Sequence, residues 1–570
     1  MTPDGWLLDG PRDDRRSLLL LLLLAAVLFA AGIGLRDPWP ADEPRFALVA
    51  RQMVESGNWL FPMRGGELYP DKPPVFMWAI ALFLKATGSL RVAFLLPSLL
   101  AGLGTLALVF DLSRRLHDRA TAWRTGLLLL LTIQFTLQAR TAQIDGLVTF
   151  FITLGVYGFL RFLLLNGGWR WYYLGWFAAG LGVITKGVGI LALFVLVPAL
   201  YTHRAEIRRA PLAAWLKGLA GPFFLVGAIS LWAVPMLLAV ARSGDPALAA
   251  YRDNILFRQT VTRYGAAWHH VEPWWLYLVN TIPAFWLPLS VLLPWLVPSW
   301  VREARKGDRR VLLLAGYVLL VLVFFSASPG KRGVYITPAT PALALLSAPI
   351  LPSLLAASWP RRLWTWLPRI VAGAAVLATV ALLLVPKVQE KLAAREFANP
   401  WPAALFLAVV ATALVLRFRG APLAALASVL GVVWIVVGFG VNPLLNDSRT
   451  PEAIMRKAEA RVPAGGMLAL VAWREQFVLF ARRPLSHFPY LMPADEQAAV
   501  AARWQPAGGE RWVLGPEKVL AKEFDLSHAA DLGTRHRQKW FLLPPGSSRP
   551  SGAAADGPVF TCTPGAHGKP

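Results

Sequence analysis

The sequence is poor in charge and almost free of cysteine. Only 16% of its 570 residues are Asp, Glu, Lys or Arg, against roughly 25% in soluble domains, so a large water-soluble enzyme is excluded. The one cysteine, Cys562, excludes an internal disulfide framework and any cysteine-based metal or haem site. The chain also lacks a P-loop, a Rossmann glycine fingerprint and an internal repeat.

Long apolar runs take the place of charge. Residues of the AVILMFWYC set make up 56% of the chain, and a bilayer core needs about 20 apolar residues per helix. We therefore expect an α-helical polytopic membrane protein with about 13 transmembrane helices. The first run, 17–35, has no small-residue cleavage site and is interpreted as a retained span. Further runs lie near 92–113, 125–139, 146–165, 172–185, 187–202, 216–241, 276–299, 310–327, 334–357, 364–386, 402–417 and 421–441, where 172–202 is either one broken span or two.

The net charge of +24 has two common causes, nucleic-acid binding and the Lys/Arg bias of cytoplasmic loops. Loops on the N-terminal side of the expected spans carry 23 Lys and Arg, and the short loops on the other side carry 7. The positive-inside rule thus explains the charge without nucleic acid. It predicts a cytoplasmic N-terminus and, with an odd number of spans, an external C-terminal tail.

Three segments do not fit the spans, and all are expected on the outer side. They are the loops 36–91 and 242–275 and the tail 442–570. The two loops belong to a membrane domain of residues 1–441. The pattern of the tail predicts a small extracytoplasmic α/β domain over 442–546, with strands at 467–473, 511–515 and 539–545. Residues 547–570, rich in Gly, Ser, Pro and Ala, are expected to be disordered.

Near the start of the loop 36–91, two adjacent acids, Asp42 and Glu43, precede a predicted amphipathic helix that ends at Gly57. Its apolar face would lie in the outer membrane interface. A helix cap with a dipole-stabilising acid is one interpretation. The other is a carboxylate at the membrane edge, where partial desolvation raises basicity and suits it to remove a proton.

Asp71 and Lys72 precede Pro73–Pro74 and a second apolar helix. A lysine before a helix N-terminus favours a phosphate, because the dipole, the free N–H groups and the ammonium act together. The alternative is a lysine that snorkels to the interface.

Two further charges stand at the ends of apolar runs. Asp145 begins a span and is either a helix cap or a functional acid. Lys186 separates two apolar runs, where an ammonium is costly unless it faces a polar cavity or the interface. The alternative for Lys186 is an ordinary short outer loop.

His269, His270 and Glu272 lie just outside the span that begins near 276. Two histidines and an acid are able to bind a divalent metal, although the spacing matches no standard zinc motif. Lys331, Arg332 and Tyr335 lie in a short outer loop. Positive charge there violates the global charge pattern, and an anionic ligand is the simplest reason for it.

Taken together, these stretches resemble the polyprenyl-phosphate-dependent glycosyltransferases with the C-type membrane fold, in particular the lipid A 4-amino-4-deoxyarabinose transferases, which are related to the protein O-mannosyltransferases. The resemblance runs from about 42 to 350 and rests on ADEPRFA, LYPDKPP, AQIDG, ITKG, HHVEPWW and KRGVYITPATPALALL, in that order.

The resemblance implies a general base at Asp42, a second acid at Asp145, and a donor-phosphate site at Lys72 with Lys331, Arg332 and Tyr335. We add Glu43 and Lys186 to the substrate-binding residues. It also implies a possible divalent metal at Asp71, His269 and His270. Such proteins often have Glu before the Lys-Pro-Pro, and Asp71 is one methylene shorter, which argues against that metal.

The predicted function is inverting transfer of a sugar from a polyprenyl-phosphate donor to a hydroxyl or phosphate of an envelope glycolipid or protein. It would occur at the outer face of the bacterial cytoplasmic membrane. The leaving phosphate needs cations and no general acid. The alternatives are a secondary transporter, a lipid-linked oligosaccharide ligase and a non-enzymatic scaffold. The expected partners are the donor, the acceptor and membrane lipids, without nucleic acid.

Overall fold

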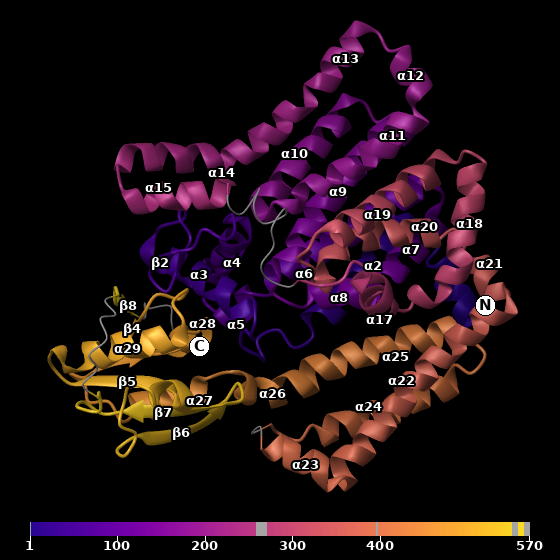
Figure 1. Cartoon of the computed structure of the whole chain (residues 1–570). Helices are drawn as coiled ribbons and strands as arrows, with labels where there is room; N and C mark the ends of the chain where they lie inside the picture. The colour runs from indigo at the N-terminus through magenta and orange to yellow at the C-terminus, as the bar shows by residue number, and fades with distance from the viewer. Residues whose placement is uncertain (1, 258–270, 395–396, 550–556, 564–570) are drawn as a thin grey trace.

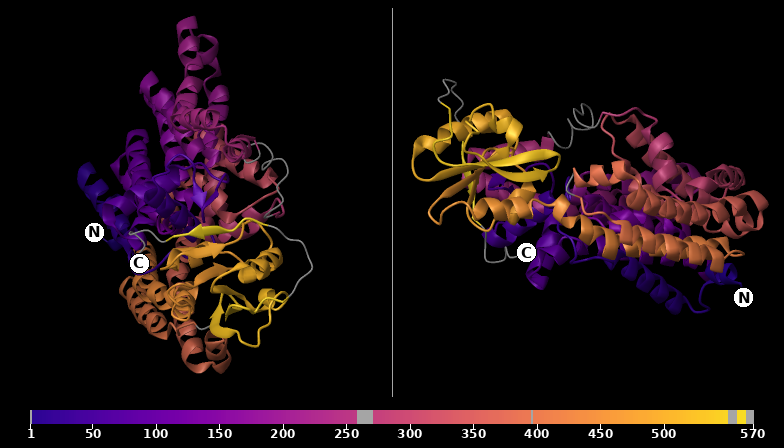
Figure 2. Two further views of the ribbon diagram at one scale, coloured as in Figure 1. Left: turned by 90° about the vertical axis from the view of Figure 1, so that its left-hand side faces the viewer. Right: turned by 90° about the horizontal axis from the view of Figure 1, so that it is seen from below.

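The computed structural model describes residues 2–257, 271–394, 397–549 and 557–563. Apolar helices form a bundle, and a six-stranded sheet lies at the end of the bundle away from the N-terminus (Figures 1 and 2). The two ends of the bundle therefore differ in architecture.

The first half of the bundle and its outer loop contain α1 (Pro3–Asp9), α2 (Asp14–Ala30), α3 (Glu43–Ser56), α4 (Val75–Thr87), α5 (Leu90–Ala93), α6 (Leu96–Leu116), α7 (Arg119–Leu131), α8 (Ile133–Ala139), α9 (Ile144–Leu165), α10 (Trp169–Lys186), η1 (Val188–Val195), α11 (Leu196–Thr202), α12 (Arg204–Arg208), α13 (Leu212–Leu219), α14 (Gly221–Ser243) and α15 (Pro246–Asp253). The second half contains η3 (Tyr277–Thr281), α17 (Ile282–Phe285), η4 (Ser290–Leu292), α18 (Leu293–Arg305), α19 (Arg309–Ala327), η5 (Gly333–Ala339), α20 (Thr340–Ser347), α21 (Leu351–Ala356), α22 (Ser358–Leu384), α23 (Pro386–Ala393), α24 (Trp401–Arg417), α25 (Pro422–Val436), η6 (Val437–Val441) and α26 (Asn442–Arg449).

The helices are those of a multi-pass membrane protein. Within the described ranges, six helices are long and apolar enough to cross a membrane, and there are up to eight spans if each of two bent helix pairs counts as one. The six coincide with the runs expected near 92–113, 146–165, 216–241, 310–327, 364–386 and 421–441. The bent pairs, 119–139 and 277–305, turn by 73° and 115° within the expected runs 125–139 and 276–299.

The sequence left open whether 172–202 is one span or two. The chain turns at Gly187, between α10 and η1, and the backbones of Gly182 and Gly189 lie so close that a Cβ on either would clash. Two small residues at the contact allow this approach. The segment therefore consists of two helices packed on each other, with Lys186 at the turn.

The C-terminal sheet is mixed, with strand order β6-β7-β5-β3-β4-β8. β3 pairs in parallel with β4 and β5, and the other pairs are antiparallel. The strands are β3 (Met467–Leu470), β4 (Leu485–His487), β5 (Arg511–Pro516), β6 (Ala530–Arg535), β7 (Gln538–Leu543) and β8 (Phe560–Cys562), and the helices around them are α27 (Glu452–Glu459), α28 (Glu475–Phe480), α29 (Ala494–Trp504), η7 (Gln505–Ala507) and α30 (Glu517–Leu520). The strands predicted at 467–473, 511–515 and 539–545 are confirmed as β3, β5 and β7.

The predicted disordered tail is partly wrong. Residues 550–556 and 564–570 lie outside the described residues, but Phe560–Cys562 form β8, which pairs with β4. The sheet therefore extends beyond residue 546. A three-residue strand among Gly, Pro and Ala has no local signal and is stabilised by its partner strand.

The two faces of the sheet belong to different hydrophobic cores. Along β3, Ala469 packs against α29 and α30, whereas Leu468 and Leu470 face the opposite side, as the period of two in a strand requires. That second core also contains Phe46 of α3 and Phe76 of α4. The sheet and the first outer loop therefore share one core.

This shared core corrects one expectation about the helix after Asp42. The predicted face of α3 is buried, with Phe46 and Met53 at most 3% exposed. Leu48 and Arg51, on other faces of the helix, are buried as well. Arg51 donates hydrogen bonds to the carbonyls of Leu479 and Val478. The helix is therefore enclosed between α4 and the C-terminal sheet instead of lying with one face on lipid.

Candidate active site

A polar cavity opens where the first outer loop meets α9, α10 and η5. Its volume is about 80 Å³. Its wall is formed by residues from five separate stretches of the chain: Asp42, Arg45, Phe46, Tyr69, Asp71, Lys72, Gln143, Ile144, Asp145, Lys186, Arg332 and Tyr335. Seven of the site residues predicted from the sequence are in this set.

Asp42 directly precedes α3 but does not cap it, since its side chain bonds to none of the N–H groups of the helix. Its carboxylate accepts a hydrogen bond of 2.7 Å from Arg332 Nη2. Burial acts to raise the pKa of Asp42, but Arg332, with smaller contributions from Arg45 and Lys186, outweighs it, and the pKa lies below its usual value. The expectation of a more basic Asp42 is therefore wrong for the resting protein, because the ion pair stabilises the carboxylate.

Asp145 and Lys186 form the second ion pair of the cavity. Lys186 Nζ lies 2.5 Å from Asp145 Oδ1 and 4.5 Å from the centre of the Tyr335 ring. Asp145 is in the first turn of α9 and only 6% exposed. Lys186 therefore faces a polar cavity, one of the two environments in which the sequence allowed a lysine, and links the start of α9 to η5.

Lys72 and Asp71 complete the charged wall. Lys72 Nζ donates to the backbone carbonyl of Asp71 at 3.1 Å, and α4 begins three residues later at Val75. The lysine thus lies at the start of an apolar helix, as its sequence position predicts, and its side chain lines the cavity instead of pointing to lipid.

Glu43 does not line the cavity. Both of its oxygens bind the Arg36 guanidinium, at 2.5 and 2.8 Å, and they also accept hydrogen bonds from the backbone N–H groups of Trp39 and Ala142. The assignment of Glu43 to substrate binding is therefore corrected. A buried carboxylate with four donors has no room for a ligand, and it fastens the loop of Asp42 to the chain before α9.

Lys331 does not line the cavity either. It is 4% exposed, and its ammonium donates to the backbone carbonyls of Ser328 and Glu272 at 2.6 and 2.7 Å. Although Arg332 is adjacent in sequence, the two side chains diverge. Lys331 is therefore corrected from a phosphate ligand to a residue that fixes the loop carrying Arg332.

Five residues of the wall were missed by the sequence reasoning, the apolar Phe46 and Ile144 and the polar Arg45, Tyr69 and Gln143. Arg45 is 4.0 Å from Asp42 and donates from Nε to Glu475 of α28 at 3.1 Å. Tyr69 is fully buried, and burial raises the pKa of its hydroxyl. Arg45 and Tyr69 belong to the stretches ADEPRFA and LYPDKPP, which carry the family resemblance. Their closeness in sequence to Asp42 and Lys72 was the signal that could have placed them in the site.

The structure describes only part of the predicted metal site. His269 and His270 lie outside the described residues, and Asp71 lines the cavity. In the part of the chain that the structure describes, no group of three or more His, Cys, Asp or Glu side chains is placed to hold a metal ion. The metal stays a prediction, and no step below depends on it.

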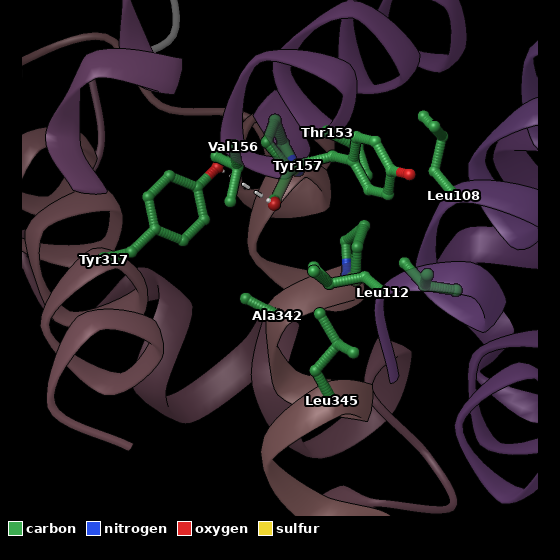
Figure 3. A pocket seen from close by; sticks show the side chains of 11 residues that line it. Leu108, Leu112, Thr153, Val156, Tyr157, Tyr317, Ala342 and Leu345 are labelled. Carbon is green, nitrogen blue, oxygen red and sulfur yellow. Dashed lines mark hydrogen bonds between the residues drawn. The ribbon is translucent and has the colours of Figure 1, made fainter. Parts of the chain in front are cut away.

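A second, much smaller cavity, of about 10 Å³, lies inside the helical bundle and is apolar (Figure 3). Leu108, Leu112, Val156 and Leu345 line it, and the Tyr317 hydroxyl at its edge donates to the carbonyl of Pro338 at 3.2 Å. Its lining residues include no carboxylate and no cation. This cavity therefore offers no charged group for acid, base or phosphate chemistry.

The fold is that of the C-type membrane glycosyltransferases. The crystal structure of ArnT from Cupriavidus metallidurans bound to undecaprenyl phosphate superposes with a TM-score of 0.73 at 19% sequence identity, over 94% of this chain and 99% of that one. An oligosaccharyltransferase from Archaeoglobus fulgidus, tethered with an acceptor peptide, gives a TM-score of 0.51 at 12% identity, over 90% and 72%. At these identities the likeness concerns the fold alone.

Sequence similarity adds particular relatives. The family model of dolichyl-phosphate-mannose-protein mannosyltransferase matches residues 71–232, which include Asp71, Lys72, Asp145 and Lys186. The undecaprenyl phosphate-alpha-4-amino-4-deoxy-L-arabinose arabinosyl transferase of Pseudomonas aeruginosa (strain UCBPP-PA14) is 32% identical over 323 residues, which are 54% of this chain and 54% of that protein. The protein of the same name from Shewanella sediminis is 27% identical over 330 residues, 56% and 57%. The chain spans about half the length of the curated relatives it matches.

Proposed function

We propose that the protein is an inverting glycosyltransferase that moves a sugar from a polyprenyl-phosphate donor to a hydroxyl or phosphate of an envelope glycolipid or protein. The observation that carries the proposal is the cavity in which Asp42 is paired with Arg332 beside Lys72. The fold and the names of the relatives support it, and those names make undecaprenyl-phosphate-linked 4-amino-4-deoxyarabinose the first donor to test.

The donor phosphate would bind between Lys72 and Arg332, which line the same cavity. As the bond to the anomeric carbon breaks, negative charge builds on the phosphate oxygens, and two positioned cations stabilise it without a general acid. Arg332 would then divide its charge between the phosphate and Asp42.

Asp42 would remove the proton of the acceptor. In the resting protein Arg332 keeps the pKa of Asp42 low, although burial acts in the opposite direction. When a phosphate takes part of the Arg332 charge, the effect of burial gains weight and the carboxylate becomes a stronger base. Donor binding would thus prepare the base, and a single displacement inverts the anomeric carbon.

Asp145 is the acid left to orient the sugar. Lys186 fixes its carboxylate at 2.5 Å, and Tyr335 covers the ammonium, so the group is rigid and able to accept hydrogen bonds from sugar hydroxyls or an amino group. We assign Asp145 to positioning the sugar ring, with Lys186 holding its carboxylate in place.

The proposal includes the full membrane arrangement: about 13 spans in residues 1–441, a cytoplasmic N-terminus and an external 442–546 domain in the bacterial inner membrane. The charge count of 23 against 7, four shorter apolar helices and the position of the sheet opposite the N-terminus support it. In a Cys562→Ser background, a membrane-impermeant maleimide on intact cells should label Lys518→Cys and not Arg305→Cys. Labelling of Arg305→Cys alone would reverse the orientation.

The decisive experiment uses the full-length protein in lipid nanodiscs, with the undecaprenyl-phosphate-linked aminosugar as donor and lipid A as acceptor. Mass spectrometry should detect the sugar on lipid A, and no transfer should occur from a nucleotide-linked sugar. Asp42→Asn should lower kcat by about 10²–10⁴-fold with unchanged Tm. The matched control is Asp111→Asn, another acid paired with arginines. Full activity of Asp42→Asn would overturn the assigned base.

A further inference from the structure

One carboxylate from the C-terminal region lies directly behind the wall of the outer cavity. Glu475, in the first turn of α28, is 7% exposed and does not itself line the cavity. Its Oε1 accepts hydrogen bonds from Arg45 Nε at 3.1 Å and from Arg64 Nη2 at 2.5 Å. Arg45 lies on α3 and Arg64 in the short strand β1 (Met63–Arg64). One acid of the later chain therefore binds two arginines of the first outer loop.

Arg64 is fixed against the C-terminal region on its own account. Its guanidinium lies 4.2 Å from the centre of the Tyr490 ring and 4.8 Å from that of the Trp473 ring, an arrangement that stabilises a cation over aromatic faces. The backbone N–H of Tyr490 also donates to Glu67, three residues further along the first outer loop, at 2.9 Å. The Arg64 side of the Glu475 contact is therefore anchored.

Arg45 lies between Glu475 and the proposed base. It follows Asp42 by three residues, a spacing at which side chains of one helical turn meet, and its Nη1 is 4.0 Å from Asp42 Oδ1. The Nε of Arg45 nevertheless donates to Glu475, at 3.1 Å. Asp42 accepts its hydrogen bond from Arg332 Nη2 at 2.7 Å. The two acids thus divide the two arginines between them.

This division matters for a carboxylate that must accept a proton. An arginine hydrogen-bonded to a carboxylate stabilises the charged form and makes it a weaker base. In the proposed reaction the donor phosphate takes part of the Arg332 charge, which relieves Asp42 of that effect. A second arginine bound to Asp42 would cancel the relief. It would also occupy Oδ1, whereas Arg332 binds Oδ2.

We propose that Glu475 is a positioning residue that holds Arg45 away from Asp42 and so keeps the base able to accept a proton. The proposal rests on the proposed function, because it concerns the base of the same reaction. Glu475 does not line the cavity, so it acts through Arg45 and not on a substrate. The region that follows the membrane helices in sequence then supplies a working part of the active site.

The first test is a cryo-electron microscopy structure of full-length Glu475→Gln in lipid nanodiscs, compared with wild type. The amide keeps the shape of the carboxylate and loses its charge, so Arg45 should turn to the acid that remains. The distance from Arg45 Nη1 to Asp42 Oδ1 should shorten from 4.0 Å to that of a charge-assisted hydrogen bond, about 2.8 Å.

Glu452→Gln is the matched control. Glu452 is likewise shared by two arginines, Arg91 at 3.8 Å and Arg482 at 3.6 Å, and neither of them lines the cavity. The control therefore removes the same charge from the same region without releasing Arg45. Its distance from Arg45 to Asp42 and its kcat should both match those of wild type.

The second test measures sugar transfer as a double-mutant cycle. Glu475→Gln should lower kcat about tenfold and leave the donor KM unchanged. In an Arg45→Gln background, Glu475→Gln should have no further effect on kcat, because the arginine that would reach Asp42 is gone. An acid with a merely structural role would lower kcat in both backgrounds, since its contact with Arg64 is lost in both.

Two results would overturn the proposal: an Arg45 in Glu475→Gln that stays as far from Asp42 as in wild type, or an equal loss of kcat in both backgrounds. If Glu475→Gln does not fold, Arg64→Gln/Glu475→Gln replaces both partners of the buried contact. This pair should shorten the same distance, whereas Arg64→Gln alone should not. If wild type transfers no sugar, the proposed function fails, and the position of Arg45 in the variants still decides whether Glu475 holds it.

Discussion

The outer cavity and the cluster around Asp111 contain the same residue types and are built differently. Asp111 on α6 binds Arg115 at 2.7 Å and Arg114 at 3.2 Å, and accepts from the Tyr157 hydroxyl of α9 at 2.6 Å. Arg161 of α9 lies 3.6 Å from it as well. Two of its four partners are thus within four residues of it. Asp42 has Arg45 nearby at 4.0 Å, but the arginine that donates a hydrogen bond to it, Arg332, comes from 290 residues away, and these residues line a cavity.

The difference shows what distinguishes a site from a structural charge cluster. Local partners on one helix face form wherever the sequence spacing allows, and pairs as exposed as Asp111 with Arg115, at 27% and 39%, contribute little. Distant charges gathered around a cavity persist only because several packed segments hold them. We therefore expect function to depend on the outer cavity and stability to depend weakly on the Asp111 cluster.

After Asp42 itself, the largest effect is expected from its partner Arg332. Arg332→Gln removes both the ion pair and a cation for the leaving phosphate, so kcat/KM should fall by about 10²–10³-fold. Arg115→Gln, the corresponding change at Asp111, should leave kcat/KM within about twofold. Steady-state transfer assays on both variants make the comparison, and equal losses would abolish the distinction between the two regions.

Lys72 should have the next largest effect. Lys72→Ala loses a charge-assisted contact to the donor phosphate and should raise the donor KM by about 10–100-fold, with unchanged Tm. Lys85→Ala, on the helix that follows Lys72, is the matched control, because Lys85 is exposed and does not line the cavity. An unaltered donor KM for Lys72→Ala would remove it from the phosphate site.

A smaller effect is expected in the pH dependence. The lowered pKa of Asp42 keeps the base ionised down to below its usual value of 3.8, so kcat/KM of wild type should stay level on acidification to about pH 5. In Arg332→Gln burial acts without its main opposing charge. The pKa then rises, and the rate falls at a higher pH than in wild type. Rate profiles between about pH 4 and pH 8 measure this, and superimposable acid limbs would contradict the pairing.

The smallest effect is expected at the Asp111 cluster itself. Asp111→Asn should lower the free energy of unfolding by about 0.5–1 kcal/mol, because its partners are partly solvated. Transfer activity should stay within about twofold. Thermal denaturation and the transfer assay on one preparation measure both quantities. A loss of transfer activity comparable to that of Arg332→Gln would show that local charge clusters also support activity.

The sequence predicts which segments form the site better than it predicts which side chains face it. Asp42, Lys72, Asp145, Lys186 and Arg332 meet in one cavity, in agreement with the family resemblance. The predictions for their immediate sequence neighbours failed. The side chains of adjacent residues point in different directions, because each binds a different partner in the folded protein. Glu43 turns to Arg36, and Lys331 turns to two carbonyls.

Local sequence pattern also predicts some elements of the fold and misses others. The strands with clear alternation, 467–470 and 511–516, and six of the long apolar runs were predicted from local pattern. The short strand Phe560–Cys562 was not, because its hydrogen bonds come from β4, about 75 residues earlier. The burial of α3 beneath the sheet was also missed, because it depends on a domain that follows in sequence.

That burial has a consequence for biogenesis. Phe46 and Phe76, near the start of the chain, share a core with Leu470 and Trp540, near its end. A ribosome delivers these two groups far apart in time, so the segment bearing Asp42 stays incompletely packed until the last strands have been synthesised. We therefore expect a chain that ends before the final strands to leave the segment bearing Asp42 without part of its core.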